Sequence, residues 1–187
     1  MSRPRLGLFG GTFDPPHLGH VAALRAAAAS GRFDEIEVTV AGDPYVKRAT
    51  GTVRPAEVRL AMARAAFAHL PLVTVSDREI ARTGPSYTID TVLEEIDDYK
   101  SIDLIVGADL LAQLDSWHEA RQLATLVRVA VVPRPGSETV FPAHWHCYEL
   151  PMEPVDLSST FIRELAGGDL SKYVPSDVIP IFEAHQG

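Results

Sequence analysis

The stretch that decides the fold runs from Leu6 to His20 and reads LGLFGGTFDPPHLGH. Its first four residues form a short apolar run, which predicts a buried strand. The two glycines that follow end this strand, and the loop after them leads into a helix that we expect from about Leu18 to Ala29, ending near Gly31. The alanine-rich part of this helix is short and carries an arginine, which favours a core helix over a signal peptide.

The rest of the chain continues the alternation of strands and helices. Further strands are predicted at Glu35–Val40, Leu72–Val75, Ile102–Val106, Leu126–Val132 and Cys147–Leu150. Helices are predicted from Pro55, with Val58, Met62, Ala65 and Ala66 on one face, at Thr88–Tyr99, through about Leu123, at Ser158–Leu165 and at Ser176–Ala184. This order predicts an α/β fold with a parallel sheet and helices on both faces, whose ligand lies beyond the carboxyl ends of the strands. With no repeat and no long linker, residues 1–187 are expected to form a single domain.

Composition narrows the class of protein. Apolar residues make up 46% of the chain, yet no segment approaches the roughly 20 uninterrupted apolar residues of a membrane span. A single cysteine gives no disulfide framework and favours a reducing cytoplasm. The net charge of −8 argues against nucleic-acid binding, whereas a few cations, backbone N–H groups and a metal ion travelling with the nucleotide would suffice for ATP. We therefore expect a cytoplasmic enzyme or small-ligand binder.

The loop after the first strand has the chemistry of an anion site. Gly10 and Gly11 permit close approach of a phosphate to main-chain N–H groups. His17 and His20 are three residues apart at the start of a helix, so they share a face at its positive end. An ordinary glycine turn is also consistent with these residues. A zinc site would need further ligands besides Asp14, so no metal site is predicted. The alternative role of Asp14 is to brace the loop by accepting hydrogen bonds from backbone N–H groups.

A second candidate anion site lies near the carboxyl end of the chain. Ser158, Ser159 and Thr160 begin a predicted helix, and Arg163 follows on its first turns. Hydroxyls and N–H groups at a helix start, together with a guanidinium, suit a phosphate. Taken alone, the segment is equally an ordinary serine-capped helix with a surface arginine.

Together the two strings indicate a family. GGTFDPPHLGH closely resembles the H-x-G-H signature of the nucleotidyltransferase superfamily, and its double glycine and Asp-Pro-Pro resemble the bacterial nicotinate mononucleotide adenylyltransferases. SSTFIRE, about 140 residues later, resembles the S-S-T-x-I-R motif that grips the β- and γ-phosphates of ATP in that family. The resemblance implies a Rossmann-like nucleotidyltransferase fold. It also implies transfer of the adenylyl group of ATP, with Mg²⁺, to nicotinic acid mononucleotide, giving nicotinic acid adenine dinucleotide and pyrophosphate.

The same resemblance implies roles for the residues of the two motifs. His17 and His20 would contact the α-phosphate and bridging oxygen, and Arg163 would join the serine cap around the leaving pyrophosphate. Lys47 would contact the acceptor phosphate. The remaining implied ATP contacts in these motifs are Gly10, Gly11, Thr12, Phe13, Ser158, Ser159 and Thr160.

Three other segments resemble the substrate-binding parts of the nicotinate enzymes. GPSYTIDT would place Thr88 at the pyridine carboxylate. VGADLLAQLDSWHEA would place Gly107 and Asp109 on ATP, with Asp109 near the ribose. The same segment would place Trp117 against the nicotinate ring, with His118 beside it at the substrate. VVPRPG would place Arg134 on a phosphate or ribose. The alternative for Trp117 is that it anchors its helix to the core.

Two segments depart from the family pattern. After the second strand the chain carries AGDPYVKR, in which Lys47 stands in for the usual lysine and Asp43 replaces a neutral amide. A carboxylate there is unfavourable near a phosphate unless it faces away or pairs with Arg48 or Arg54. The run His144–Cys147 invites a metal interpretation, but its side chains rarely converge tetrahedrally, and an exposed strand end is favoured.

Several functions remain open at this stage. The attacking phosphate is already ionised, so catalysis should come from alignment and charge stabilisation. Nicotinamide mononucleotide and phosphopantetheine are alternative acceptors, although phosphopantetheine has no flat ring to stack on Trp117. A non-catalytic nucleotide-binding regulator on the same fold is the alternative from another class, disfavoured because both histidines and Arg163 are present. Monomer and homo-oligomer stay open.

Overall fold

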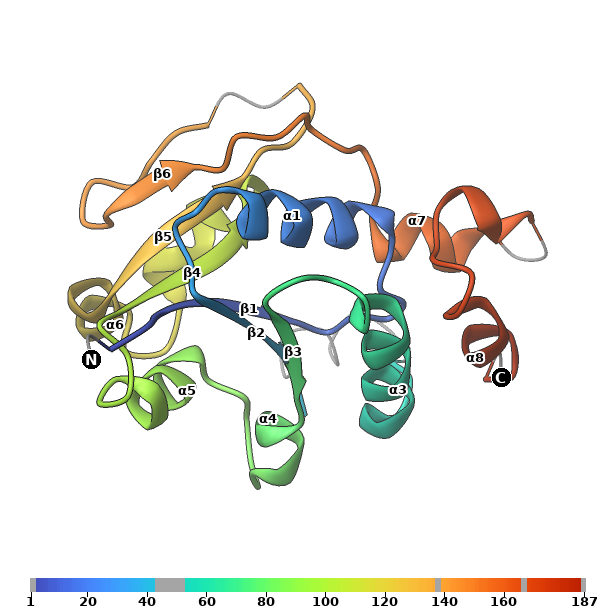
Figure 1. Ribbon diagram of the computed structural model, residues 1–187, viewed down its shortest axis with the longest axis horizontal. Helices are drawn as coiled ribbons and strands as arrows, with labels where there is room; N and C mark the ends of the chain where they lie inside the picture. Colours follow the sequence, from blue (N-terminus) through green and yellow to red (C-terminus); the bar gives the residue numbers. More distant parts are fainter. Residues whose placement is uncertain (1–2, 43–52, 137–138, 166–167, 186–187) are drawn as a thin grey trace.

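The computed structural model describes residues 3–42, 53–136, 139–165 and 168–185. In this part of the chain, strands form one parallel sheet in the order β3-β2-β1-β4-β5-β6 (Figure 1). The strands are β1 (Arg5–Gly11), β2 (Glu35–Val40), β3 (Val73–Ser76), β4 (Ser101–Gly107), β5 (Val127–Val132) and β6 (Cys147–Glu149). The order reverses beside β1, because the chain adds β2 and β3 on one side of it and β4 to β6 on the other. This is the switch point at which α/β sheets bind ligands.

Helices cover both faces of the sheet, as predicted. The first face carries α1 (Leu18–Ala29) and α3 (Ala56–Phe67), and the second carries α5 (Thr88–Glu95), α6 (Ala120–Leu126) and the 3₁₀ helix η1 (Ala108–Ser116). The short helices are α4 (Arg78–Ala81), α7 (Ser159–Glu164), α8 (Ile179–Glu183) and the 3₁₀ turn η2 (Leu170–Lys172). Figure 1 shows α1 lying along the sheet and α7 and α8 gathered beyond α3.

Alternation along the central strands divides the core into two layers. In β1, Leu6 and Leu8 pack into the layer under α5 and α6, whereas Phe9 packs into the layer under α1 and α3. Gly7 faces the layer under α1 and α3, where a Cβ would lie 3.1 Å from the side chains of Phe33 and Ile105. The central strands are therefore buried on both faces, which explains their continuous apolar sequences.

A third hydrophobic cluster attaches the carboxyl-terminal segment to the outer side of α3. Met62 packs there with Ile162 of α7 and Phe182 of α8, and Val58, Ala65 and Ala66 contact the same cluster. The predicted apolar face of this helix is thus confirmed, and its partner is the segment that carries the SSTFIRE motif. Packing of α7 on α3 brings that motif to the sheet.

The structure corrects several predicted boundaries. α5 ends at Glu95 rather than Tyr99, and the next turn is held by a hydrogen bond from the Arg3 guanidinium to the carbonyl of Asp97 (2.6 Å). The segment after Gly107 is a 3₁₀ helix, and α4 and η2 were not predicted.

The expected exposed strand end around His144 is wrong at its centre. Trp145 is buried, and its indole Nε1 donates to Asp115 Oδ1 at 2.9 Å. The segment is a turn there, and β6 begins only at Cys147. Burial of the indole against a partner 30 positions away in the sequence draws the segment onto the sheet layer under α5 and α6.

Candidate active site

A cleft of about 460 Å³ opens at the carboxyl ends of β1, β4 and the neighbouring strands. It collects most of the predicted site residues from motifs that are far apart in the sequence. Those that line it are Gly10, Gly11, Thr12, Phe13, His17, His20, Thr88, Gly107, Asp109, Trp117, Arg134, Ser158, Ser159 and Thr160. His118 and Arg163 are not among the lining residues, and Lys47 and Asp43 lie outside the described part of the chain.

The two histidines form a stacked pair at the start of α1. His17 precedes the helix in an extended conformation, and its ring lies on that of His20 with centroids 3.7 Å apart and planes at 25°. The backbone N–H of His17 donates to Nδ1 of His20 at 3.1 Å. Since Nδ1 accepts, the proton of the neutral His20 ring is on Nε2, which makes Nε2 the hydrogen-bond donor that the ring offers.

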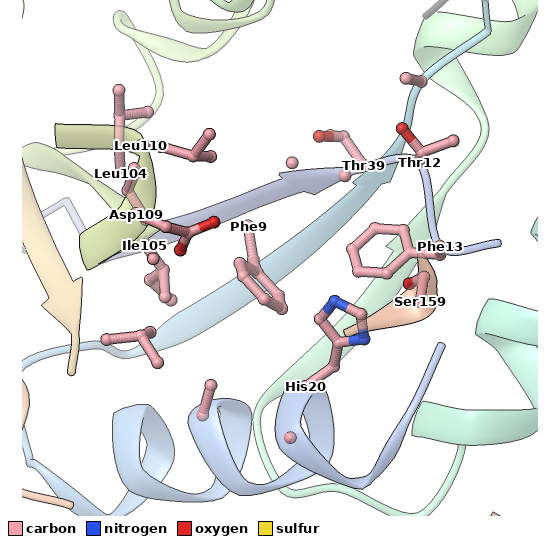
Figure 2. A pocket seen from close by; sticks show the side chains of 18 of the residues that line it. Phe9, Thr12, Phe13, His20, Thr39, Leu104, Ile105, Asp109, Leu110 and Ser159 are labelled. Carbon is pink, nitrogen blue, oxygen red and sulfur yellow. The ribbon is translucent and has the colours of Figure 1, made fainter. Parts of the chain in front are cut away.

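Aromatic side chains hold His20 in the cleft. Figure 2 shows its ring projecting from α1 toward Phe9 and Phe13. Both contacts are edge-on, with ring centroids 5.9 Å from Phe9 and 5.1 Å from Phe13. Phe13 is itself fixed, because it is buried, has a positive φ of 50°, and packs edge-on against Phe67. Phe13 therefore supports the histidine from the core as well as lining the cleft.

Gly11 is required by this packing. A Cβ on Gly11 would lie 2.8 Å from the ring of Phe13. Any larger residue would displace the aromatic ring that supports His20.

Asp14 braces the loop rather than facing a ligand. Its carboxylate is buried and accepts from the Arg54 guanidinium at 2.8 Å and from the Arg54 backbone N–H at 3.2 Å. Its carbonyl accepts from Arg163 Nη1 at 2.7 Å. Asp14 therefore braces its loop as expected, but through the side chain and the backbone N–H of Arg54, which lies just before α3.

The two anion motifs meet directly. Ser158 caps α7, as predicted, by accepting from the N–H of Phe161 at 3.1 Å. Ser159 Oγ donates to the carbonyl of Pro15 at 2.9 Å, so the start of α7 is docked on the loop of residues 10–16, the glycine loop. Arg163 lies at the edge of this junction and is exposed as a residue, and its guanidinium also donates to Thr160 Oγ1 at 3.2 Å. In this conformation it holds the loop and does not reach into the cleft.

The other end of the cleft is formed by the loops after β4 and β5. Asp109 and Arg134 pair at 3.3 Å, and Arg134 also donates to the carbonyls of Val155 and Leu157 at 3.3 and 2.8 Å. Gly107 lies directly under the Asp109 carboxylate, and a Cβ there would collide with it. The pair is partly exposed, so a ligand can reach both side chains.

The acceptor-side residues come from α5 and η1. Thr88 is the first residue of α5, and Trp117 follows η1 directly. Trp117 is half-buried, packing on the core while lining the cleft, so both predicted roles fit its position. His118 is exposed and stacks on Tyr87, with ring centroids 4.1 Å apart and planes at 21°. Tyr87 lies between Ser86 and Thr88, which line the cleft, but neither Tyr87 nor His118 is among the lining residues.

Comparison with known proteins places the chain in a family. The sequence model described as Cytidylyltransferase-like matches residues 8–165. This chain belongs to the cytidylyltransferase-like family. Within it, the "Probable nicotinate-nucleotide adenylyltransferase" of Methylibium petroleiphilum is 39% identical over 184 residues, covering 94% of this chain and 86% of the relative. The protein of the same name from Roseiflexus sp. is 39% identical over 196 residues, covering 99% and 98%.

Solved structures agree on the fold. The Plasmodium falciparum nicotinic acid mononucleotide adenylyltransferase complexed with NaAD superposes with a TM-score of 0.79 at 18% identity, covering 97% of this chain and 95% of that one. The predicted nucleotidyltransferase fold and the predicted relationship to nicotinate-nucleotide adenylyltransferases are confirmed.

In this member of the cytidylyltransferase-like family, sequence reasoning missed three polar residues of the cleft, namely Thr39, Glu79 and Ser86. Glu79 is buried and accepts from Thr91 Oγ1 at 3.1 Å. Burial raises the pKa of the Glu79 carboxyl, although hydrogen bonding to Thr91 opposes the rise. Ser86 stood in the GPSYTIDT string, but no local pattern marks Glu79, because its burial depends on contacts with α5.

Two kinds of feature are absent from the described part of the chain. Within the described ranges no three or more His, Cys, Asp or Glu side chains gather as a metal-binding group. The helices seen there are also too short or too polar to cross a membrane.

Proposed function

We propose that the cleft binds ATP with its metal ion beside nicotinic acid mononucleotide and catalyses adenylyl transfer, as the names of the family relatives indicate. The observation that carries the proposal is the meeting of the GGTFDPPHLGH loop and the SSTFIRE helix around His20. Neither motif alone distinguishes an anion site from an ordinary turn or cap. Together they surround a space large enough for a nucleotide, next to an aromatic residue and a threonine suited to a second substrate.

In the proposed reaction an oxygen of the acceptor phosphate attacks the α-phosphorus of ATP. The bond from the α-phosphorus to the bridging oxygen breaks, and pyrophosphate leaves with its metal ion. The attacking oxygen is already ionised, so no general base is needed. Nε2–H of His20 donates to an α-phosphate or bridging oxygen as negative charge grows there, and stacking on His17 and hydrogen bonding at Nδ1 keep the ring in place.

On the donor side, the serine cap at the start of α7 and the N–H groups of the glycine loop surround the pyrophosphate portion. Asp109 and Arg134 are assigned to the ribose end. Arg163 holds the loop carbonyl of Asp14 in the structure, and we assign it to pyrophosphate through a change of rotamer when the anion is bound.

The metal ion is assigned to the substrate, as MgATP. The carboxylates near the cleft are already engaged, since Asp109 pairs with Arg134, Glu79 accepts from Thr91 and Asp14 pairs with Arg54. Such a site fits a metal ion held mainly by phosphate oxygens and water, which is the usual manner of Mg²⁺.

On the acceptor side, Thr88 is assigned to the pyridine carboxylate and Trp117 to the ring face. Lys47 remains the proposed contact of the acceptor phosphate, and His118 acts at the border of this site through Tyr87. We further propose that residues 1–187 act as one domain, because the cleft draws its lining from Leu8 to Thr160, and that the reaction takes place in the cytoplasm.

Pyrophosphate release with MgATP tests the proposal, with nicotinic acid mononucleotide, nicotinamide mononucleotide and phosphopantetheine offered separately. Release with the nicotinate acceptor in clear excess over the amide is expected. ATP binding without release for all three acceptors would contradict the proposed reaction and favour a nucleotide-binding regulator. Sedimentation of the same preparation distinguishes a monomer from a homo-oligomer.

A further inference from the structure

A buried arginine on α3 connects the loops of the cleft without lining it. Arg59 is only 1% exposed, and its guanidinium donates to three backbone carbonyls. Nε donates to Arg54 at 2.9 Å, Nη1 to Thr12 at 3.0 Å and Nη2 to Gly42 at 3.3 Å. Burial lowers the pKa of Arg59, and the nearby charge of Asp14 opposes this, so the guanidinium stays charged.

The carbonyls that Arg59 binds belong to different sides of the site. Thr12 lies in the glycine loop that leads to the histidine pair. Gly42 lies just after β2, and its N–H donates to Ser86 Oγ at 3.0 Å. Ser86 is two residues before Thr88, in the loop assigned to the acceptor. Contacts therefore run from Thr12 through Arg59 and Gly42 to Ser86.

The position of Gly42 in this series is tightly confined. A Cβ on Gly42 would collide with the backbone carbonyl of Glu79, so the strand end sits directly on the α4 segment. With its carbonyl held by Arg59 and its N–H by Ser86, Gly42 has little freedom to shift. Displacement of the glycine loop relative to the acceptor loop would break one of these hydrogen bonds.

We propose that Arg59 is a positioning residue that fixes the ATP side of the cleft relative to the acceptor side. The inference rests on the proposed transfer reaction, in which attacking oxygen and α-phosphorus must be aligned, and misplacement by about 1 Å costs about 100-fold in rate. A neutral apolar side chain would fill the same space without the desolvation cost of a buried cation. The three donors of the rigid guanidinium plane fix three loops relative to one another, which apolar packing alone would not do.

The test compares Arg59→Lys with Arg64→Ala. Lysine keeps the positive charge, but one ammonium group cannot replace three donors spread over a planar fork. Arg64 is a matched control, because it lies on the same helix and forms a surface ion pair with Asp77 at 3.2 Å. For Arg59→Lys we expect kcat with nicotinic acid mononucleotide to fall at least about tenfold while the Kd for ATP stays within about threefold. Arg64→Ala should match the wild type in both.

Two additional measurements separate positioning from general destabilisation. Combining Arg59→Lys with Ser86→Ala should lower kcat by less than the product of the single effects, because both changes loosen Gly42. Hydrogen exchange of the Thr12 and Gly42 amides should accelerate in Arg59→Lys but not in Arg64→Ala, whether or not an acceptor is turned over.

The outcomes are distinct for the two proposals. A wild-type protein that releases no pyrophosphate contradicts the proposed reaction, and the exchange measurement then still decides on Arg59. Unchanged kcat in a folded Arg59→Lys protein overturns the inference, as does a loss confined to ATP affinity. Fully multiplicative effects with Ser86→Ala, or exchange that accelerates at neither amide, overturn it as well.

Discussion

Replacement of His20 by asparagine should separate its structural contact from its chemical one. The Nδ1 atom of His20 accepts the backbone N–H of His17, whereas catalysis is assigned to Nε2–H. The amide oxygen of asparagine lies close to the position of imidazole Nδ1, so it can keep accepting that N–H while no donor remains at the position of Nε2. Loss of one preorganised donor to a developing anion typically costs about 10²–10³ in kcat, or about 2.7–4 kcal/mol.

Two companion variants complete the test. His20→Gln offers an amide N–H near the position of Nε2 but cannot accept from His17, so it should retain more turnover and lose stability. His20→Ala loses both contacts. Its stability should fall by about 0.5–2 kcal/mol, the usual cost of losing a helix-start hydrogen bond, in addition to the loss of kcat.

The assay is single-turnover pyrophosphate release at saturating MgATP and nicotinic acid mononucleotide, with thermal unfolding of each variant. We expect His20→Asn to unfold close to the wild type and to react at least about 10²-fold more slowly. If His20→Asn keeps turnover within about threefold of the wild type, Nε2 is not the donor and the assigned mechanism fails.

Three other changes test the remaining parts of the site. Trp117→Ala should raise the KM for nicotinic acid mononucleotide up to about tenfold, since an aromatic stack contributes about 0.5–1.5 kcal/mol, while Trp117→Phe should stay near the wild type. If steady-state assays give Trp117→Ala the same KM as the wild type, Trp117 only anchors its segment to the core. Ser159→Ala removes the hydrogen bond to Pro15 and should lower the free energy of unfolding by about 0.5–1.5 kcal/mol in urea titrations, with Ser171→Ala, near the surface of η2, as a comparison for serine removal away from the cleft. Burial raises the pKa of Glu79 in the folded state above its ordinary value of 4.5, so the wild type loses stability as the pH rises from 4.5 through the raised pKa. Over that pH range the Tm of Glu79→Gln should therefore rise relative to that of the wild type, and a Tm difference that does not change with pH would contradict this.

Local sequence patterns sufficed for the elements whose structure is decided locally. The run before Gly10 is a strand and the segment after His17 is a helix because apolar spacing and glycine placement already specify them. The apolar face of α3 was also predictable, because helical spacing decides which side chains share a side. Strand order was not predicted, since it depends on pairing between segments that are distant in the chain.

Local sequence patterns could not predict the burial of residues whose environment is formed by segments distant in the chain. Trp145 is buried because Asp115, 30 positions earlier, accepts its indole N–H. Glu79 is buried by Thr91 and its neighbours on α5, and Arg59 reads in the sequence as an ordinary helix arginine. The resemblance supplied the side chains that we propose contact ligands, but the buried side chains proposed to position them became visible only in three dimensions.

The electrostatics of the site also depend on contacts between residues that are distant in the sequence. A protein of net charge −8 binds a polyanion only if the local field differs from the global one. Here the arginines near the cleft are already paired or bonded, Arg54 with Asp14, Arg134 with Asp109 and Arg59 with backbone carbonyls. These arginines hold the loops in place more than they provide positive charge for binding a phosphate. In the proposed complex, attraction for phosphate then comes chiefly from backbone N–H groups of the glycine loop and from the start of α1, which act at short range and are little screened by salt, with Arg163 added when it turns to the pyrophosphate. We therefore expect ATP affinity to depend only weakly on ionic strength, and a steep dependence would show that further arginines besides Arg163 leave their partners and carry the binding instead.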